Sequence, residues 1–194
     1  MSSKSGPLRR ASEFFYAKST LVTALMATTA FVGYTLLVLS GQGKAFEVAS
    51  STIRSLGTSL GFGQAEILAF FAERTAEQIA AYITFNQVWD TLYGVIYGVM
   101  YVVWASVLLA PYSQKVGMLN LLPFGQVLFD WLENVGVSGL ASQYLADGTI
   151  SSTTAQLAST ASSIKWTFAL LVYGVILVGI VARIARALKG RSKS

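Results

Sequence analysis

Residues 165–189, KWTFALLVYGVILVGIVARIARALK, carry no charged side chain from Trp166 to Ala182 and are flanked by charge at both ends. About 20 apolar residues in a helix cross the hydrocarbon layer of a membrane, because a helix satisfies its own backbone polar groups. Of the 194 residues, 54% are hydrophobic and 12% are charged, whereas soluble domains have roughly 25% charged residues. We therefore expect an all-α polytopic integral membrane protein.

Three more segments are apolar enough to join this one as transmembrane helices. The first follows a basic N-terminus, and its apolar run exceeds the roughly 7–15 residues of a secretory signal, so we expect it to be retained. Pro111 ends the second, and polar residues make the third less regular. The four predicted spans cover residues 19–41, 88–110, 118–143 and 164–186. We expect one membrane domain over residues 1–194, with an extracytoplasmic helical segment at 44–85.

The distribution of charge predicts the orientation of these spans. Cytoplasmic segments close to spans collect Lys and Arg, and ten of the 14 basic residues fall in 1–18, 111–117 and 183–194. The opposite segments balance three basic residues against five acidic ones: Lys44, Arg54 and Arg74 against Glu47, Glu66, Glu73, Glu77 and Asp147. We expect both termini in the cytoplasm and the chain in a plasma membrane, here a bacterial inner membrane.

Two segments outside the spans have a recognisable pattern. In the stretch 65–85, Ile67, Phe71 and Tyr82 lie largely on one side, which predicts an amphipathic helix. Because its polar face is acidic, packing over the mouth of the bundle is at least as plausible as lying on the membrane surface. The Ser/Thr/Ala-rich stretch 151–163 is interpreted as a polar loop before the last span.

The composition excludes several chemistries. The chain has no Cys and no His, which rules out disulfides, thiolate nucleophiles, Cys/His zinc sites and imidazole catalysis. We expect no metal and no cofactor. We also expect no nucleic-acid partner, because the basic residues lie beside spans and lack interleaved aromatic residues. The expected partners are the lipid bilayer and either another membrane protein or a second copy of the chain.

The third predicted span carries an unusual group of polar residues. Asp130, Glu133 and Asn134 stand at i, i+3 and i+4 and therefore share one helical face. Ionisable groups inside spans are costly, by about 2.5–3.5 kcal/mol at a helix centre, and persist when they pair or serve a function. Lys165 and Asp90, at the outer ends of their spans, complete a predicted polar vestibule.

The second predicted span adds an aromatic face. Asp90, Tyr93 and Tyr97 recur at steps of three or four, followed by Tyr101 and Trp104. Their hydroxyls are candidates to hydrogen-bond the carboxylates of span three. Gly94 and Gly98 form a G-x-x-x-G pattern, which predicts close helix packing. The candidate ligand-binding residues are thus Asp90, Tyr93, Tyr97, Asp130, Glu133, Asn134 and Lys165, although packing and a structural polar network are the alternative interpretations.

In this pattern the chain resembles a group of small bacterial four-helix membrane proteins of uncharacterised function. The resemblance covers about residues 61–175 and includes an L-P and a D-x-x-E-N motif. The matching residues are Gly61, Phe62, Glu66, Tyr82, Asp90, Leu122, Pro123, Asp130, Glu133, Asn134 and Lys165. The resemblance implies four spans and a role centred on the acidic motif, and it brings no activity with it.

Three main functions are open at this stage, and transport or channel activity, for which four spans would need an oligomer to enclose a path, is a further alternative. The first is binding of a polar or cationic ligand, a lipid or an ion at the acidic intramembrane site. The second is a structural or accessory subunit of a larger membrane complex. A lipid-modifying enzyme comes third, because the chain has no standard catalytic motif. In such an enzyme Asp130 and Glu133 would act as general acid and base, with Tyr97 as proton donor.

Overall fold

The computed structural model describes residues 6–49, 51 and 55–191, and all regular secondary structure within them is helical. The prediction of an all-α chain is confirmed. Three helices are long and apolar enough to cross a membrane: Leu21–Phe46, Ala76–Val116 and Ser152–Lys189. The remaining predicted span, 118–143, corresponds to helix α8 (Leu122–Asp147). Polar residues within α8 lower its mean hydropathy, so α8 is not among the helices that are apolar enough to cross a membrane by composition.

The first apolar helix follows a short helix at the N-terminus. Helix α1 (Pro7–Lys18) ends at Ser19, and Thr20 begins α2 (Leu21–Tyr34) by exchanging hydrogen bonds with Thr23, an N-terminal capping arrangement. The helix continues without a break through a π-helical turn, η1 (Thr35–Leu39), α3 (Ser40–Gly43) and η2 (Lys44–Phe46). It therefore extends beyond the predicted end at residue 41.

The segment predicted as 44–85 is largely helical but is not separate from the next span. It contains η3 (Leu56–Thr58), α4 (Gln64–Ala72) and α5 (Ala76–Thr84). Helix α5 continues through the π-helical turn η4 (Phe85–Asp90) into α6 (Thr91–Leu109), so this helix begins at Ala76, ahead of the predicted start of the span at residue 88. Residues 52–54, including Arg54, lie outside the described part of the chain. The basic residues Lys4 and Lys193 do so as well.

The apolar side of α4 and α5 packs on the helical bundle. Ile67, Phe70, Phe71 and Tyr82 are completely buried, in a cluster with Leu140 of α8 and residues of α9. This agrees with the prediction of a segment packed over the mouth of the bundle. The predicted single amphipathic helix is interrupted at Thr75, whose hydroxyl accepts a hydrogen bond from the Gln78 backbone N–H and caps α5.

Short turns connect the long helices. Helix α6 ends at Leu109, ahead of Pro111 as predicted, and η5 (Ala110–Tyr112), α7 (Ser113–Val116) and η6 (Leu119–Leu121) lead to α8. Gly148, with φ of 73°, ends α8. Helix α9 (Ser152–Arg191) begins soon afterwards, so the interpretation of 151–163 as a loop is wrong.

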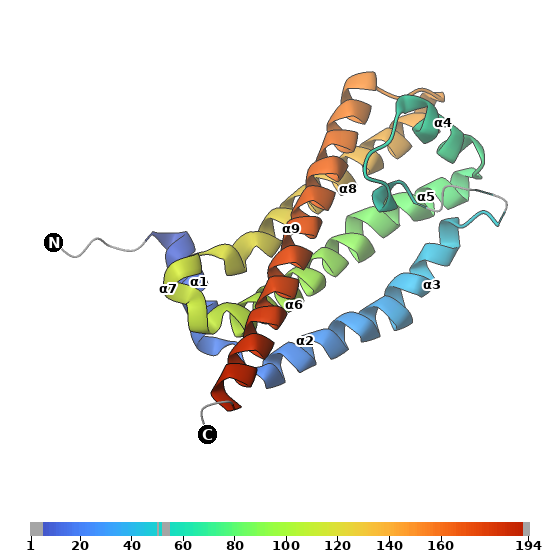
Figure 1. Cartoon of the computed structure of the whole chain (residues 1–194). Coiled ribbons are helices and arrows are strands. Elements are labelled where there is room, and N and C mark those ends of the chain that lie inside the picture. Colours follow the sequence, from blue (N-terminus) through green and yellow to red (C-terminus); the bar gives the residue numbers. More distant parts are fainter. Residues whose placement is uncertain (1–5, 50, 52–54, 192–194) are drawn as a thin grey trace.

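The helices run between two ends of the molecule (Figure 1). Helices α1 and α7 and the C-terminal end of α9 gather at one end, and α4 and the α8–α9 connection lie at the other. Helix α6 packs against α2, α8 and α9. A Cβ atom built on Gly98 would lie 2.5 Å from Cγ2 of Val127 in α8, so the predicted close packing at the G-x-x-x-G pattern is confirmed.

Candidate functional site

Lys165 lies at the centre of a buried polar cluster formed by α8, α9 and η3. Its Nζ atom lies 3.3 Å from Oδ1 of Asp130 and contacts Oε2 of Glu133 as a second ion pair. It also donates a hydrogen bond of 2.8 Å to the carbonyl oxygen of Gly57. Lys165 is 7% exposed and Glu133 is fully buried. Lys165 therefore pairs with both Asp130 and Glu133, the two carboxylates predicted to share one helical face, although it comes from a different helix.

Asp90 joins the cluster from the junction of η4 and α6. Its Oδ2 atom accepts a hydrogen bond of 3.0 Å from Nδ2 of Asn134. The hydroxyl of Thr91 donates to the carbonyl oxygen of Asn86, five residues earlier, at the π-helical turn that ends with Asp90. Such turns inside α-helices occur often at functional sites.

The backbone over Lys165 is held by serines of α9. Ser162 donates to the carbonyl oxygen of Ser59 at 2.8 Å, and Ser163 donates to that of Leu60 at 2.7 Å. These bonds attach the segment after η3 to α9, on the same helix as Lys165. The Gly57 carbonyl is thereby held where it accepts the lysine hydrogen bond.

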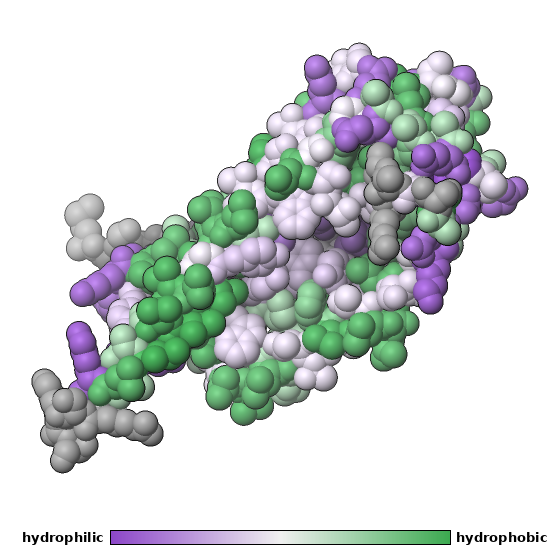
Figure 2. Space-filling model, turned by 45° about the vertical axis from the view of Figure 1, so that its right-hand side comes forward, coloured by the Kyte–Doolittle hydropathy of each residue, from purple (hydrophilic) through white to green (hydrophobic). Residues whose placement is uncertain are grey.

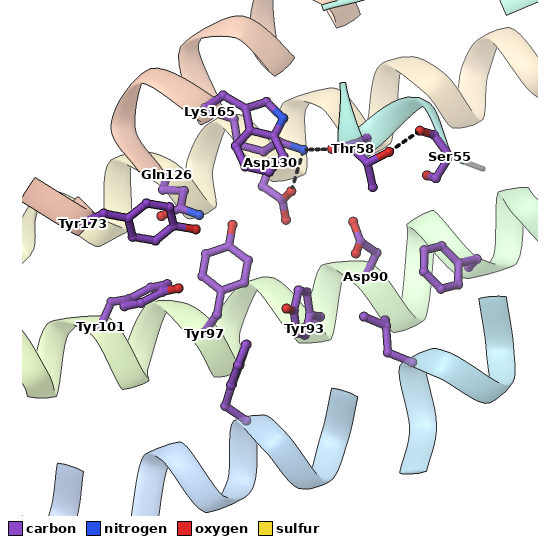
Figure 3. A pocket seen from close by; sticks show the side chains of 15 residues that line it. Ser55, Thr58, Asp90, Tyr93, Tyr97, Tyr101, Gln126, Asp130, Lys165 and Tyr173 are labelled. Carbon is purple, nitrogen blue, oxygen red and sulfur yellow. Dashed lines mark hydrogen bonds and ion pairs between the residues drawn. The ribbon is translucent and has the colours of Figure 1, made fainter. Parts of the chain in front are cut away.

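A cavity of about 320 Å³ opens beside this cluster (Figure 3). This volume is within the usual range of small-molecule sites, roughly 300–1,000 Å³. Asp90, Asp130 and Lys165 face it, and the hydroxyl of Tyr97 points into it from α6. The complete lining comprises Phe31, Leu39, Ser55, Gly57, Thr58, Phe85, Asp90, Tyr93, Tyr97, Tyr101, Gln126, Asp130, Lys165, Trp166 and Tyr173.

Five of the seven predicted site residues therefore lie on the cavity wall. These are Asp90, Tyr93, Tyr97, Asp130 and Lys165. The other two, Glu133 and Asn134, do not line the cavity, and each contacts a residue that does. They hold Lys165 and Asp90 in place.

Four buried polar atoms, all from residues that line the cavity, lack a hydrogen-bond partner among the described residues. They are the hydroxyl of Tyr97, Oε1 of Gln126, Oδ2 of Asp130 and Nε1 of Trp166. Tyr97, Gln126 and Asp130 are at most 7% exposed. The hydroxyl of Tyr97 interacts with Asp130 but forms no hydrogen bond of standard geometry with it. Buried polar groups in proteins are nearly always hydrogen-bonded, so these donors and acceptors are available to a ligand.

The rings that line the cavity form a continuous series. The ring centroids of Phe31 and Tyr93 are 5.5 Å apart, those of Tyr93 and Tyr97 5.4 Å, and those of Tyr97 and Tyr101 6.2 Å. Tyr101 then contacts Tyr173 of α9 at 5.8 Å. Aromatic faces therefore connect α2 to α9 across the cavity. Trp104, which follows in the predicted aromatic face, instead donates to the hydroxyl of Thr28 in α2.

The cluster contains more acidic than basic groups. Asp90, Asp130 and Glu133 contribute three carboxyl groups, and Lys165 contributes one ammonium group. In a low-dielectric site such an excess of negative charge requires protons or a cation. Within the described residues, no group of three or more acidic side chains is arranged to hold a metal ion.

Several of the residues that line the cavity were not predicted from the sequence. Gln126 precedes Asp130 by one helical turn and Tyr173 follows Lys165 by two, so helical spacing alone contained a signal for both. Nothing in the sequence pointed to the Gly57 carbonyl, because its position depends on how the chain folds back over α9.

No known protein family, curated protein or solved structure matches this chain. The resemblance of the L-P and D-x-x-E-N motifs to small four-helix membrane proteins therefore stays a prediction.

Proposed function

We propose that this chain is a four-span membrane protein that binds a cationic ligand in the cavity beside Asp130. The observation that carries the proposal is the buried Oδ2 atom of Asp130, which points toward the cavity (Figure 3) and accepts no hydrogen bond of standard geometry from the described residues. An anionic ligand at this position would meet the carboxylates of both Asp90 and Asp130. A cationic ligand would offset the excess of acidic groups.

The arrangement of basic residues supports four spans. Lys18 ends α1, Lys115 lies in α7, and Arg183 and Arg186 lie near the C-terminal end of α9, and these elements gather at one end of the molecule (Figure 1). Helix α8 runs from that end to the opposite one and is about 39 Å long at about 1.5 Å per residue. Under the positive-inside rule, both termini lie in the cytoplasm and α8 is the third span.

This topology has a direct test, because the chain contains no cysteine of its own. Gln114→Cys and Ser152→Cys each place a thiol at an exposed position, one before α8 and one after it. A membrane-impermeant maleimide added to sealed right-side-out vesicles should label Ser152→Cys only, and Gln114→Cys should react after the vesicles are opened. Labelling of both in sealed vesicles would show that α8 does not cross.

Ligand binding is tested by the thermal stability of the purified protein in maltoside micelles. Tetramethylammonium chloride should raise the Tm of the wild type above its value in sodium chloride of equal ionic strength, because a ligand that binds only the folded state stabilises it. Asp130→Asn should lose this increase. Glu73→Gln, which makes the same chemical change at an exposed site, should keep it. Equal Tm values in the two salts for the wild type would contradict the proposal.

The second candidate is a structural subunit in which the cluster only holds helices together. The ion pairs of Lys165 with Asp130 and Glu133 favour it, since they already join α8 to α9. In that case Asp130→Asn should lower the Tm, tetramethylammonium should have no effect, and a partner protein or a second copy should co-purify in mild detergent.

A further inference from the structure

We propose that the ligand is a membrane-borne amphiphile with an ammonium head group, which enters the cavity sideways from the lipid between α2 and α9. This inference rests on the proposed function and specifies the class of ligand. It follows from where the cavity opens and from the kinds of side chain at its two ends.

The cavity opens on the side of the molecule. Tyr173 lines the cavity and is nevertheless 43% exposed, and its neighbours on α9, Leu170 and Leu177, are 64% and 63% exposed. Tyr173 follows Lys165 by eight residues, or about 12 Å of helix, and lies within the uncharged stretch of α9. The opening therefore lies at a depth where lipid chains, and not water, surround the protein.

The surface around the opening fits this position. Figure 2 shows a hollow on this face, with hydrophilic residues in its depth and hydrophobic surface on either side. Helix α2 forms one wall through Phe31, and α2 and the turn η1 that continues it expose large apolar side chains, Leu25 and Leu36 respectively. A ligand that reaches the cavity by this route must first dissolve in the membrane, which requires an apolar part.

The two ends of the cavity differ in chemistry. Asp90, Asp130 and Lys165 lie at one end, and Tyr101 and Tyr173 lie at the other. Asp90 and Tyr101 are eleven residues apart on one continuous helix, or about 16 Å. The cavity thus has room for a head group at the carboxylates and for the first part of an alkyl chain along the rings.

The head group that fits this end is an ammonium. Carboxylates attract its charge, and the aromatic side chains of Tyr93, Tyr97 and Trp166 also line the cavity. Aromatic rings attract organic cations through their quadrupole, and they bind quaternary ammonium groups in this way. An alkylammonium also has apolar surface around its charge, which suits rings better than a hydrated inorganic ion does.

The test is photoaffinity labelling in non-ionic maltoside micelles. The probe is dodecyltrimethylammonium with a diazirine on its alkyl chain, and labelled residues are mapped by mass spectrometry. Labelling should fall on cavity residues, Phe31, Tyr101 and Tyr173 among them, and excess unlabelled dodecyltrimethylammonium should suppress it. Excess dodecyl sulfate, which has the same chain and the opposite charge, should not.

The variants separate the head group from the chain. In Asp130→Asn, the concentration of unlabelled dodecyltrimethylammonium needed to suppress labelling should rise by about 10–100-fold, the effect expected for losing an interaction with a charged group. In Glu73→Gln this concentration should be unchanged. Labelling that is spread over exposed residues such as Leu25 and Leu36 without competition would overturn the inference, as would equal competition by dodecyl sulfate in the wild-type protein. If tetramethylammonium still stabilised the wild type and not Asp130→Asn, only the amphiphile inference would fail. Loss of that stabilisation as well would contradict the proposed function.

Discussion

Replacing Lys165 by methionine tests the polar cluster most severely. The change keeps an unbranched side chain that is one atom shorter, and it removes the ion pairs with Asp130 and Glu133 and the hydrogen bond to Gly57. Removing one partner of a buried ion pair typically costs about 3–5 kcal/mol, because the other charge stays buried without compensation. For a chain of this size each kcal/mol corresponds to roughly 2–4 °C in Tm, so we expect Tm to fall by about 6–20 °C.

The assay is thermal unfolding in maltoside micelles, followed by circular dichroism. Lys115→Met makes the same change at an exposed lysine in α7 and should leave Tm nearly unchanged. Adding Glu133→Gln to Lys165→Met should recover part of the loss, with a coupling free energy of about 0.5–3 kcal/mol. Equal Tm values for Lys165→Met and Lys115→Met would contradict this prediction, since they would mean that the buried carboxylates do not need Lys165.

Two further predictions concern packing and pH. Gly98→Ala should lower the free energy of unfolding, measured by chemical denaturation, by about 1–3 kcal/mol, because the added Cβ would lie 2.5 Å from Cγ2 of Val127. Gly174→Ala should leave the free energy of unfolding unchanged, because no atom lies within 4 Å of its added Cβ. Thr149 donates hydrogen bonds of 2.8 and 2.7 Å to Asp147, which lowers the pKa of Asp147 below its ordinary value. The stabilisation from this carboxylate is full at neutral pH and is lost as the pH falls through the lowered pKa, so the difference in Tm between wild type and Asp147→Asn should narrow on acidification.

The apolar helices and the polar cluster were both accessible from the sequence. Long uncharged runs identify helices of spanning length, and the spacing of Asp130, Glu133 and Asn134 puts them on one face of α8. A buried carboxylate needs a partner, and Lys165, at the outer start of the last predicted span, was the obvious cation within the chain. Composition and helical geometry are local properties, which explains why these predictions could be made.

The start of α9 was not predicted, because its Ser and Thr content is typical of a loop. The helical signal there lies in small residues instead: Ala155, Ala158 and Ser162 recur at steps of three or four and are buried. A Cβ atom on Gly136 of α8 would lie 2.8 Å from that of Ala158. Packing of α9 against α8 at this short distance favours small side chains, and a hydropathy pattern does not reveal a helix that packs through small residues.

The aromatic side of the cavity depends on contacts between distant segments. Phe31 and Tyr173 are far apart in the sequence, and they meet the same series of rings through Tyr93 and Tyr101. Which face of α2 and of α9 turns toward α6 is set by the packing of all three helices. Local patterns in the sequence do not reveal this packing.

The most direct test of the account is equilibrium dialysis of radiolabelled tetramethylammonium against the purified protein in maltoside micelles. We predict saturable binding of one cation per chain, abolished by Asp130→Asn and retained by Glu73→Gln. Absence of saturable binding to the wild type, or equal binding to both variants, would contradict the claim that the cavity beside Asp130 is a cation site.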